Sequence, residues 1–307
     1  MPTQTVHVIL NPKSGGGRAG RLRSEIEREL NARGVSFIIH ETLAAGHARE
    51  LAAQAAARGA SLIAAAGGDG TIHDVANGLL SNGHDVPLAV IPIGTGNDFA
   101  KLIPGARTRA GAYEIIARPA FRNFDVGFVQ WPDASEYFVN GMGTGIDVEV
   151  VRQILRLPRL PGPLKYLLGL VRALAVYRPV TVRATLPGEV IERSVMMLAI
   201  GNGICQGGGF YLTPHARPDD SRLELCVVQE IPLWMVALVL PLVLRGTHTR
   251  HAAVTMRGFA SLRFDAISEA PLFFQLDGEL REPPGARWLQ VEVRPGVLRV
   301  AVAGNRG

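Results

Sequence analysis

The sequence predicts two structural parts, an α/β domain with a parallel sheet followed by a mostly antiparallel β domain. Strand and helix patterns alternate through residues 1–121, as expected for a parallel sheet covered by helices. From residue 122 onward, strand patterns follow one another with few helical interruptions. The chain has 307 residues, of which 47% are hydrophobic, so it has enough apolar material for two cores.

In the first domain we expect strands at residues 5–10, 35–42, 61–66 and 86–93. The helical patterns cover RLRSEIERELNAR, GHARELAAQAAARG, TIHDVANGLLS and the beginning of a further helix in NDFAKLI. The third strand, SLIAAA, is apolar almost throughout, which is typical of a strand buried on both faces.

The second domain is expected to be built from eight strand-rich stretches. These are RNFDVGFVQ, EYFVNGMG, VTVRATL, SVMMLAIGN, RLELCVVQ, AVTMRGFASLRFDA, PLFFQLDGEL and WLQVEVRPGVLRVAV. Helices are expected around Ile146–Leu157, Leu164–Val176 and Leu233–Leu244. The apolar stretch Ile231–Leu244 is shorter than the roughly 20 residues of a membrane-spanning helix, and Pro241 interrupts it. The start lacks the long apolar region of a signal peptide, so we expect a cytoplasmic protein.

The charge of the chain is carried almost entirely by arginine. The formal net charge is +5, and the only lysines are Lys13, Lys101 and Lys165. Genomic codon bias is the simpler explanation, and attraction to anionic partners such as phosphates or acidic lipids is the functional alternative. Nucleic acid is not expected as a partner, because the arginines are scattered and only 6% of residues are aromatic. Cys205 and Cys226 lie in apolar surroundings and are expected to be buried thiols in a reducing compartment.

Three glycine-rich turns follow strands of the first domain: NPKSGGG (11–17), GGDGT (67–71) and GTGND (94–98). The carboxyl ends of parallel strands line the ligand crevice of an open sheet. Glycine lets the backbone approach a ligand closely, and the following helix start offers free amides to an anion. The spacing matches neither a Walker A loop nor a dinucleotide fingerprint.

Asp69 raises a question, because a carboxylate repels phosphate unless a cation lies between them. Mg²⁺ held by one or two carboxylates is the natural mediator, with Asp69 and Asp98 as candidates. The alternative is local, since T-x-x-D at Thr71–Asp74 and at Thr95–Asp98 also fits a helix capping box. In the first loop, Asn11 and Lys13 are candidates for phosphate contacts.

Six segments in order resemble the diacylglycerol kinase catalytic-domain family. They are NPKSGGG, GGDGT, IPIGTGNDFAK, VNGMGTGIDVEV, IGNGICQGGGFYLTPHARPDDSRLELCVV and LDGEL. This family includes bacterial lipid kinases and the sphingosine and ceramide kinases, and it is related to the NAD kinases. The resemblance implies a Rossmann-like, NAD kinase-like α/β domain over residues 1–121 and a β-sandwich over 122–295. Residues 296–307 would form a last strand that returns to the first domain.

The resemblance also implies ATP and Mg²⁺ as cofactors and assigns site residues. The nucleotide positions are Thr42, Gly67, Gly68, Asp69, Gly70, Thr71, Ile72, His73 and Thr95, joined by Asn11, Asn97 and Asp98 in the neighbouring loops. A structural Mg²⁺ site would use the Asp220 side chain and the carbonyls of Arg217 and Arg222. Here Ser221 replaces the family's glycine and Glu224 replaces an aspartate, which puts that site in question.

Asp277 and Glu279 flank a glycine after an apolar strand, and a tight turn there aims an acid at a substrate. The resemblance implies that Glu279 is the general base for an acceptor hydroxyl, with Asp277 orienting it or binding a metal-linked water. Without the resemblance, a surface hairpin with two solvated acids explains the pattern equally well.

The acceptor is expected to be a lipid, diacylglycerol-like or related, at a membrane surface. Residues 156–178 mix apolar side chains with Arg156, Arg159, Lys165, Arg172 and Arg178, so they form either a bilayer-binding segment on the inner membrane face or a core helix. A soluble acceptor such as NAD and a non-catalytic nucleotide-binding regulator are the alternatives. A homo-oligomer is left open.

Overall fold

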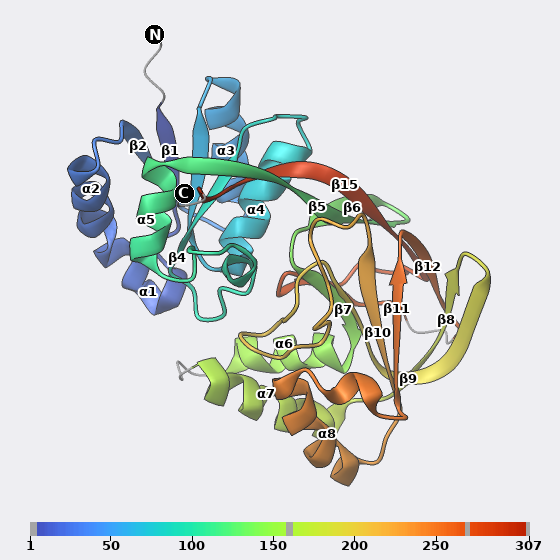
Figure 1. Ribbon diagram of the computed structural model, residues 1–307. Helices are drawn as coiled ribbons and strands as arrows, with labels where there is room; N and C mark the ends of the chain where they lie inside the picture. The colour runs from blue at the N-terminus through green and yellow to red at the C-terminus, as the bar shows by residue number, and fades with distance from the viewer. Residues whose placement is uncertain (1–4, 158–161, 268–270, 305–307) are drawn as a thin grey trace. The chain divides into compact units, whose positions relative to one another are not determined.

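The computed structural model describes residues 5–157, 162–267 and 271–304, and the chain divides into two compact units. Unit 1 comprises Met1–Phe124 and Gly296–Gly307, and unit 2 comprises Asp125–Pro295. The boundaries fall inside two long strands, β5 (Pro119–Trp131) and β15 (Trp288–Ala303), so each of these strands runs from one unit into the other (Figure 1).

Unit 1 is built on a parallel sheet in the order β2-β1-β3-β4. The strands are β1 (Val6–Leu10), β2 (Phe37–Glu41), β3 (Leu62–Gly67) and β4 (Leu88–Pro92). Every residue of β1, β3 and β4 is buried, as the continuous apolar sequence predicts. The end of β15 joins this sheet parallel to β4, with Val300 opposite Leu88.

Helices cover both faces of this sheet (Figure 1). One face carries α1 (Ser14–Arg21), α2 (Arg23–Ala32) and α5 (Arg109–Ala117), and the other carries α3 (His47–Ala57) and α4 (Asp69–Leu80). The helix expected from NDFAKLI is only a short 3₁₀ turn, η1 (Phe99–Leu102), so that expectation was wrong. The true helix is α5, whose first turn is capped by the Thr108 hydroxyl accepting from the Gly111 amide at 3.1 Å.

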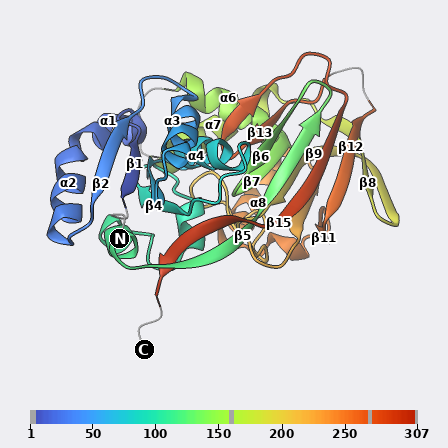
Figure 2. The ribbon, with the colours of Figure 1, turned by 90° about the horizontal axis from the view of Figure 1, so that it is seen from above.

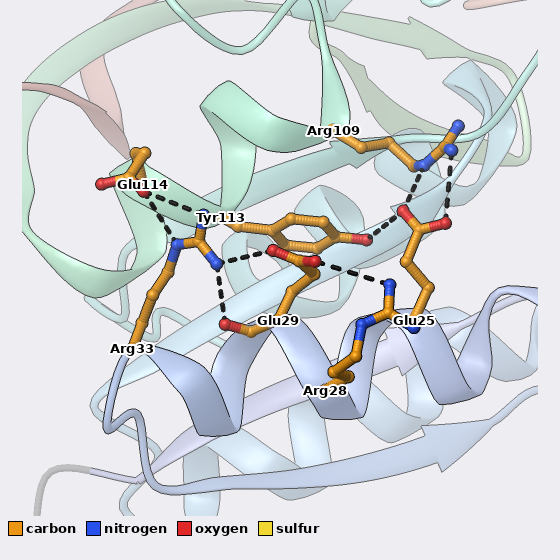
Figure 3. Close-up of polar contacts among 7 residues, drawn as sticks. All are labelled: Glu25, Arg28, Glu29, Arg33, Arg109, Tyr113 and Glu114. Atoms are coloured by element: carbon orange, nitrogen blue, oxygen red, sulfur yellow. Dashed lines mark hydrogen bonds and ion pairs between the residues drawn. The ribbon is translucent and has the colours of Figure 1, made fainter.

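A charged network ties the unexpected helix α5 to α2 (Figure 3). Arg109 Nε donates to Glu25 Oε1 at 2.8 Å, and the Tyr113 hydroxyl donates to the same oxygen at 3.2 Å. The hydrogen bond from Arg109 lowers the pKa of Glu25 against the opposing effect of burial. The network continues through Arg33, which bridges Glu29 at 2.7 Å and Glu114 at 2.9 Å. These contacts are structural and join two helices far apart in sequence.

Unit 2 is built mainly from antiparallel β-strands, and Figure 2 shows several of them side by side. Its path runs β14-β13-β7-β9-β8-β12-β15, β10 pairs with β9 and β11, and β5 pairs with β6 and β15. The strands are β6 (Ala134–Phe138), β7 (Gly141–Gly145), β8 (Val180–Leu186), β9 (Glu189–Gly201), β10 (Leu223–Gln229), β11 (Val254–Phe259), β12 (Ser261–Ala266), β13 (Phe274–Leu276) and β14 (Glu279–Arg281), with β5 and β15. Their shared core contains Phe138, Phe264 and Phe274.

The described part of unit 2 also contains the helices α6 (Ile146–Arg156), α7 (Gly162–Val176) and α8 (Leu233–Arg245) and the 3₁₀ turn η2 (His248–Arg250). The helices pack on β9, β10 and β11 through a second core that includes Ile146, Leu170, Val239 and Cys226. Both cysteines are buried, and neither forms a disulfide within the described residues. Within the described ranges, no helix combines the length and the apolar character needed to cross a membrane. The prediction of an α/β part followed by an antiparallel β part is confirmed.

Candidate active site

The three glycine-rich turns of unit 1 are joined to one another by hydrogen bonds. The Asn11 side-chain amide donates to the Thr71 hydroxyl at 3.1 Å, which links the first turn to the second. The Gly67 carbonyl accepts from the amides of Ile93 and Gly94 at 2.8 and 3.1 Å, which links the second turn to the third. The Phe99 amide donates to Asp69 Oδ1 at 3.2 Å. The turns therefore form one continuous loop cluster at the carboxyl ends of β1, β3 and β4.

Glycine is required where the second and third turns touch. A Cβ atom on Gly94 would lie 2.5 Å from the Gly68 Cα atom and 2.8 Å from Asn97 Oδ1. A Cβ atom on Gly68 would lie 3.2 Å from the Gly94 Cα atom. The two backbones therefore pack directly against each other, and a side chain at Gly94 would force them apart.

The helix after the second turn begins earlier than the sequence pattern predicts. Helix α4 begins at Asp69 with Gly68 as its N-cap, so Thr71 lies within the first turn. The capping-box interpretation of Thr71 and Asp74 was wrong, because Gly68 is the N-cap of α4 and the Thr71 hydroxyl accepts a hydrogen bond from the Asn11 side chain. Thr95 is not a cap either, because the residue before η1 is Asp98. Asp98 is buried and accepts from Lys101 Nζ at 2.6 Å.

The other residues predicted to bind the nucleotide fall into two groups. Thr42, Ile72 and His73 are buried, and His73 contacts Asn77 one turn further along α4. Gly68, Asp69 and Gly70 are partly exposed, and Thr95 is exposed. Thus Ile72 and His73 present their side chains to the core, while the Gly68–Gly70 stretch faces solvent.

Asn97 holds the third turn in an uncommon backbone conformation. Its φ angle is +50°, and its Nδ2 atom donates to the Gly94 carbonyl at 3.0 Å. Its Oδ1 atom is buried and has no hydrogen-bond partner among the described residues. A buried carbonyl oxygen without a partner beside the glycine pair is a hard donor of the kind that suits Mg²⁺ or a bridging water.

In unit 2, the predicted acids sit on a two-residue hairpin turn. Asp277 and Gly278 have φ angles of +50° and +91°, and Leu276 pairs with Glu279 across β13 and β14. Two successive positive φ angles with the sequence Asp-Gly indicate a type I′ turn. The Glu279 side chain is exposed, and no described residue donates a hydrogen bond to its carboxylate.

Asp277 is an anchor instead of a solvated acid. It is 8% exposed, and its carboxylate accepts from the backbone amides of Val139, Asn140 and Gly141 at 3.0, 2.8 and 2.9 Å. Its own amide donates to the Gly141 carbonyl at 2.8 Å. The surface-hairpin alternative, which makes both acids solvated, was therefore wrong for Asp277.

The loop predicted to hold a structural metal is exposed. Asp220 Oδ1 accepts from the Arg222 amide at 3.1 Å, Arg222 Nη2 donates to the Gly258 carbonyl at 2.7 Å, and Arg217 pairs with Asp219 at 3.4 Å. The described part of the chain contains no group of three or more His, Cys, Asp or Glu residues placed to hold a metal. Any cation here would depend on backbone carbonyls together with Asp220.

Ser221 adopts a left-handed backbone conformation that glycine adopts without strain. Its φ angle is +61°, and its amide donates to Asp125 Oδ2 at 2.6 Å. A left-handed conformation costs a residue with a Cβ atom about 1 kcal/mol. We expect Ser221→Gly to raise the melting temperature by about 2–4 °C, measured by calorimetry. Ser221→Ala, which keeps the Cβ atom, should give no gain, and an unchanged melting temperature in Ser221→Gly would show that the loop is not strained.

Unit 2 also contains an apolar cavity of about 90 Å³ beneath α8. Its walls come from α6, α7, α8 and the strands below them, and they include Leu170, Met196, Phe210, Val239 and Val254. The polar residues in its wall are Asp147 and His248. Sequence reasoning did not find this cavity, because its lining side chains read as ordinary core positions.

Comparison with known proteins shows the family to which the chain is similar. Residues 5–129 match the model of the diacylglycerol kinase catalytic domain, and residues 140–302 match the YegS C-terminal NAD kinase beta sandwich-like domain. A curated protein from Stenotrophomonas maltophilia, named "Probable lipid kinase YegS-like", is 31% identical over 98% of this chain and 96% of its own length. A protein of Bacillus subtilis named "Diacylglycerol kinase" is 30% identical over 89% of this chain and 88% of its own.

A solved structure supports the fold independently. The crystal structure of a diacylglycerol kinase from Bacillus anthracis covers 99% of this chain and 98% of its own, with a TM-score of 0.72 and 21% identity. At that identity the likeness shows the fold alone. The family models and the similarity to curated relatives over nearly the whole chain confirm the resemblance found in the six sequence segments. The chain belongs to the diacylglycerol kinase catalytic-domain family.

Proposed function

We propose that this protein is an ATP- and Mg²⁺-dependent lipid kinase that transfers the γ-phosphoryl group to a lipid hydroxyl. The observation that carries the proposal is the exposed Glu279 carboxylate on a turn that the buried Asp277 fixes. Phosphoryl transfer needs positioning, charge neutralisation and a group that orients the attacking oxygen. An anchored carboxylate open to solvent is suited to the last of these tasks.

The loop cluster of unit 1 supports nucleotide binding. At Gly68 and Gly94 the two backbones lie where a side chain would not fit, so a ligand can approach the chain closely there. Helix α4 begins directly after Gly68, and the start of a helix favours an anion such as phosphate. Asp69, Asp98 and the unpaired Asn97 Oδ1 are the oxygen donors available for Mg²⁺. When bound, Mg²⁺ neutralises phosphate charge. Asn11 and Thr71 would hold the loop in shape around the phosphates.

Glu279 would remove the proton from the acceptor hydroxyl as the hydroxyl oxygen attacks the γ-phosphorus. Of the two roles open to Asp277, its contacts favour orienting the turn, because backbone amides occupy both of its carboxylate oxygens. A second Mg²⁺ is proposed at Asp220 with the carbonyls of Arg217 and Arg222, where the positive φ angle of Ser221 gives the loop the shape that glycine would give.

The acceptor is proposed to be a glycerolipid with an apolar tail, diacylglycerol-like or related. The Bacillus subtilis relative is named a diacylglycerol kinase. The apolar cavity of unit 2 offers a place where hydrocarbon would be removed from water. NAD as acceptor does not need such a cavity, so the lipid is the better match to unit 2.

Helices α7 and α8 form the surface that we propose to contact an anionic bilayer. Trp234 and Leu238 lie one turn apart on α8 and are each 64% exposed, and Leu164, Leu167 and Val171 are exposed on α7. The sequence contains no Asp or Glu between residues 151 and 186 or between 231 and 264, whereas it contains Lys165, Arg172, Arg178 and Arg245 there. Exposed apolar side chains in segments whose only charged residues are cations match an acidic lipid surface. Arg159, which belongs to the same basic segment of the sequence, lies outside the described residues.

We expect the double variant Trp234→Ala/Leu238→Ala to bind vesicles of anionic phospholipid at least about 10-fold more weakly, because burial of these side chains contributes a few kcal/mol. Co-sedimentation at several salt concentrations measures this. Val190→Ala removes an apolar side chain with 61% exposure from β9 and serves as the control. Equal binding by all three proteins would place the membrane contact elsewhere.

The function is tested by incubation with γ-labelled ATP, Mg²⁺ and fractionated membrane lipids. We expect label in one lipid fraction, which identifies the acceptor. Tight ATP binding with no transfer to any fraction would support the regulator alternative and contradict the proposal.

A further inference from the structure

A buried polar network lies directly behind the acid turn of unit 2. Gln275 on β13 is 3% exposed, and its Oε1 atom accepts from the Gly278 amide at 2.7 Å. Its Nε2 atom donates to Asp147 Oδ2 at 2.8 Å and to Gln206 Oε1 at 2.9 Å. Gly278 is the residue between Asp277 and Glu279, so this side chain holds the peptide that carries Glu279.

The chemistry of the partners permits only one orientation of the Gln275 amide. A carboxylate accepts hydrogen bonds and a backbone amide donates them. The NH₂ group must therefore face Asp147, and the carbonyl oxygen must face Gly278. Asp147 is 4% exposed in the first turn of α6, where the helix dipole favours a negative charge. Because Asp147 accepts only, it fixes which end of the Gln275 amide faces the turn.

The glycines of β7 make room for this network. A Cβ atom on Gly143 would lie within 1.9 Å of Asp147 Oδ2, and a Cβ atom on Gly141 would lie 2.4 Å from Gln206 Nε2. Gly141 and Gly143 are two apart on the strand, so they clear the same face. The space that these buried side chains occupy therefore explains the first two glycines of GMGTG.

We propose that Gln275 is a positioning residue for phosphoryl transfer, that it fixes the turn carrying Glu279, and that Asp147 sets its orientation. The turn is then held from two sides, by Asp277 through the amides of residues 139–141 and by Gln275 through the Gly278 amide. The inference rests on the proposed role of Glu279 as the base. A misplacement of about 1 Å at a reacting group costs about 100-fold in rate.

The first test is Gln275→Met, which keeps the side-chain length and removes the amide. We expect kcat for lipid phosphorylation to fall about 100-fold, while KM for ATP stays within about two-fold, because the nucleotide loops belong to unit 1. Gln290→Met is the matched control, since Gln290 makes one side-chain hydrogen bond, to Ser261 at 2.8 Å, in the same unit. If Gln275→Met keeps kcat within about two-fold of wild type, Gln275 does not position the turn, and a lower melting temperature than that of Gln290→Met would then show a structural role alone.

Exchanging the charges of residues 147 and 275 tests whether Asp147 orients the side-chain amide of Gln275 or only packs against it. Gln275→Glu places a carboxylate against Asp147, so the pair repels and kcat should fall about 100-fold. In the double variant Asp147→Asn/Gln275→Glu, the new Asn donates to Glu and the other carboxylate oxygen still accepts from Gly278, whereas Gln206 Oε1 loses its donor, so recovery is partial. We expect the double variant to recover at least about 10-fold of the lost kcat. No recovery would overturn the role of Asp147 in orienting the amide.

Measuring Glu279→Gln in parallel separates a failure of this inference from a failure of the proposed function. Activity retained in Glu279→Gln but lost in Gln275→Met would contradict Glu279 as the base and leave the turn important through another group. Loss in Glu279→Gln with activity retained in Gln275→Met would contradict the positioning role alone.

Discussion

Glu279→Gln is expected to lower kcat for lipid phosphorylation about 1000-fold, the middle of the range that general bases contribute. The amide is as long as the carboxylate but cannot accept the hydroxyl proton at neutral pH. Because Glu279 is exposed and no described residue donates to its carboxylate, the exchange should leave the melting temperature nearly unchanged. KM for ATP should also stay within about two-fold, since only the proton acceptor is lost. Steady-state kinetics with Mg²⁺–ATP and the identified lipid measure both constants.

The matched control for Glu279→Gln is Asp133→Asn. Asp133 is an exposed acid between β5 and β6, which also form an antiparallel pair of unit 2. We expect Asp133→Asn to retain wild-type kcat. A Glu279→Gln variant that retains kcat within a few-fold would contradict Glu279 as the proton acceptor.

Asp69→Asn is expected to lower kcat/KM for Mg²⁺–ATP about 100-fold, or about 2.7 kcal/mol. The side-chain oxygen of Asn can still accept from the Phe99 amide, so the link between the second and third turns remains. What disappears is the negative charge available to Mg²⁺. The activity of the variant should therefore saturate only at a higher Mg²⁺ concentration than that of the wild type.

Asp69→Ala separates the two roles of Asp69, because it removes the charge and the acceptor of the Phe99 amide together. It should lose stability as well as activity, whereas Asp69→Asn should lose activity alone. Asp85→Asn, an exposed acid in the loop before β4, is the control. If the activity of Asp69→Asn matches that of the wild type at every Mg²⁺ concentration, the carboxylate accepts the hydrogen bond from the Phe99 amide but does not bind a cation.

The sequence predicted the parallel sheet well, because its strands are continuous apolar runs that end in glycine turns. Val6–Leu10, Leu62–Gly67 and Leu88–Pro92 are all buried, and the three turns after them are joined as expected. The beginning of α4 was placed wrongly, because T-x-x-D inside a first turn resembles a capping box. The backbone of Gly68 caps this helix, and no side-chain pattern reveals that.

Buried polar residues in strands and helix starts were the main omission. Gln275 lies in a three-residue strand and Asp147 opens a helix, and each looks ordinary in its own sequence window. Their contact depends on pairing between β13 and β7, which are separated by more than 120 residues. Helix α5 was missed for a related reason, because Arg109–Ala117 is held by Glu25 of α2 and by Arg33 at the end of α2, both far away in the sequence.

The central claim is that the γ-phosphoryl group passes to a lipid. The most direct measurement is a single reaction containing γ-labelled ATP, Mg²⁺, NAD⁺ and mixed vesicles of membrane lipid, followed by separation of the organic and aqueous phases. The account predicts label in a phospholipid of the organic phase, with none in NADP⁺. Label in NADP⁺ and none in the organic phase would contradict it.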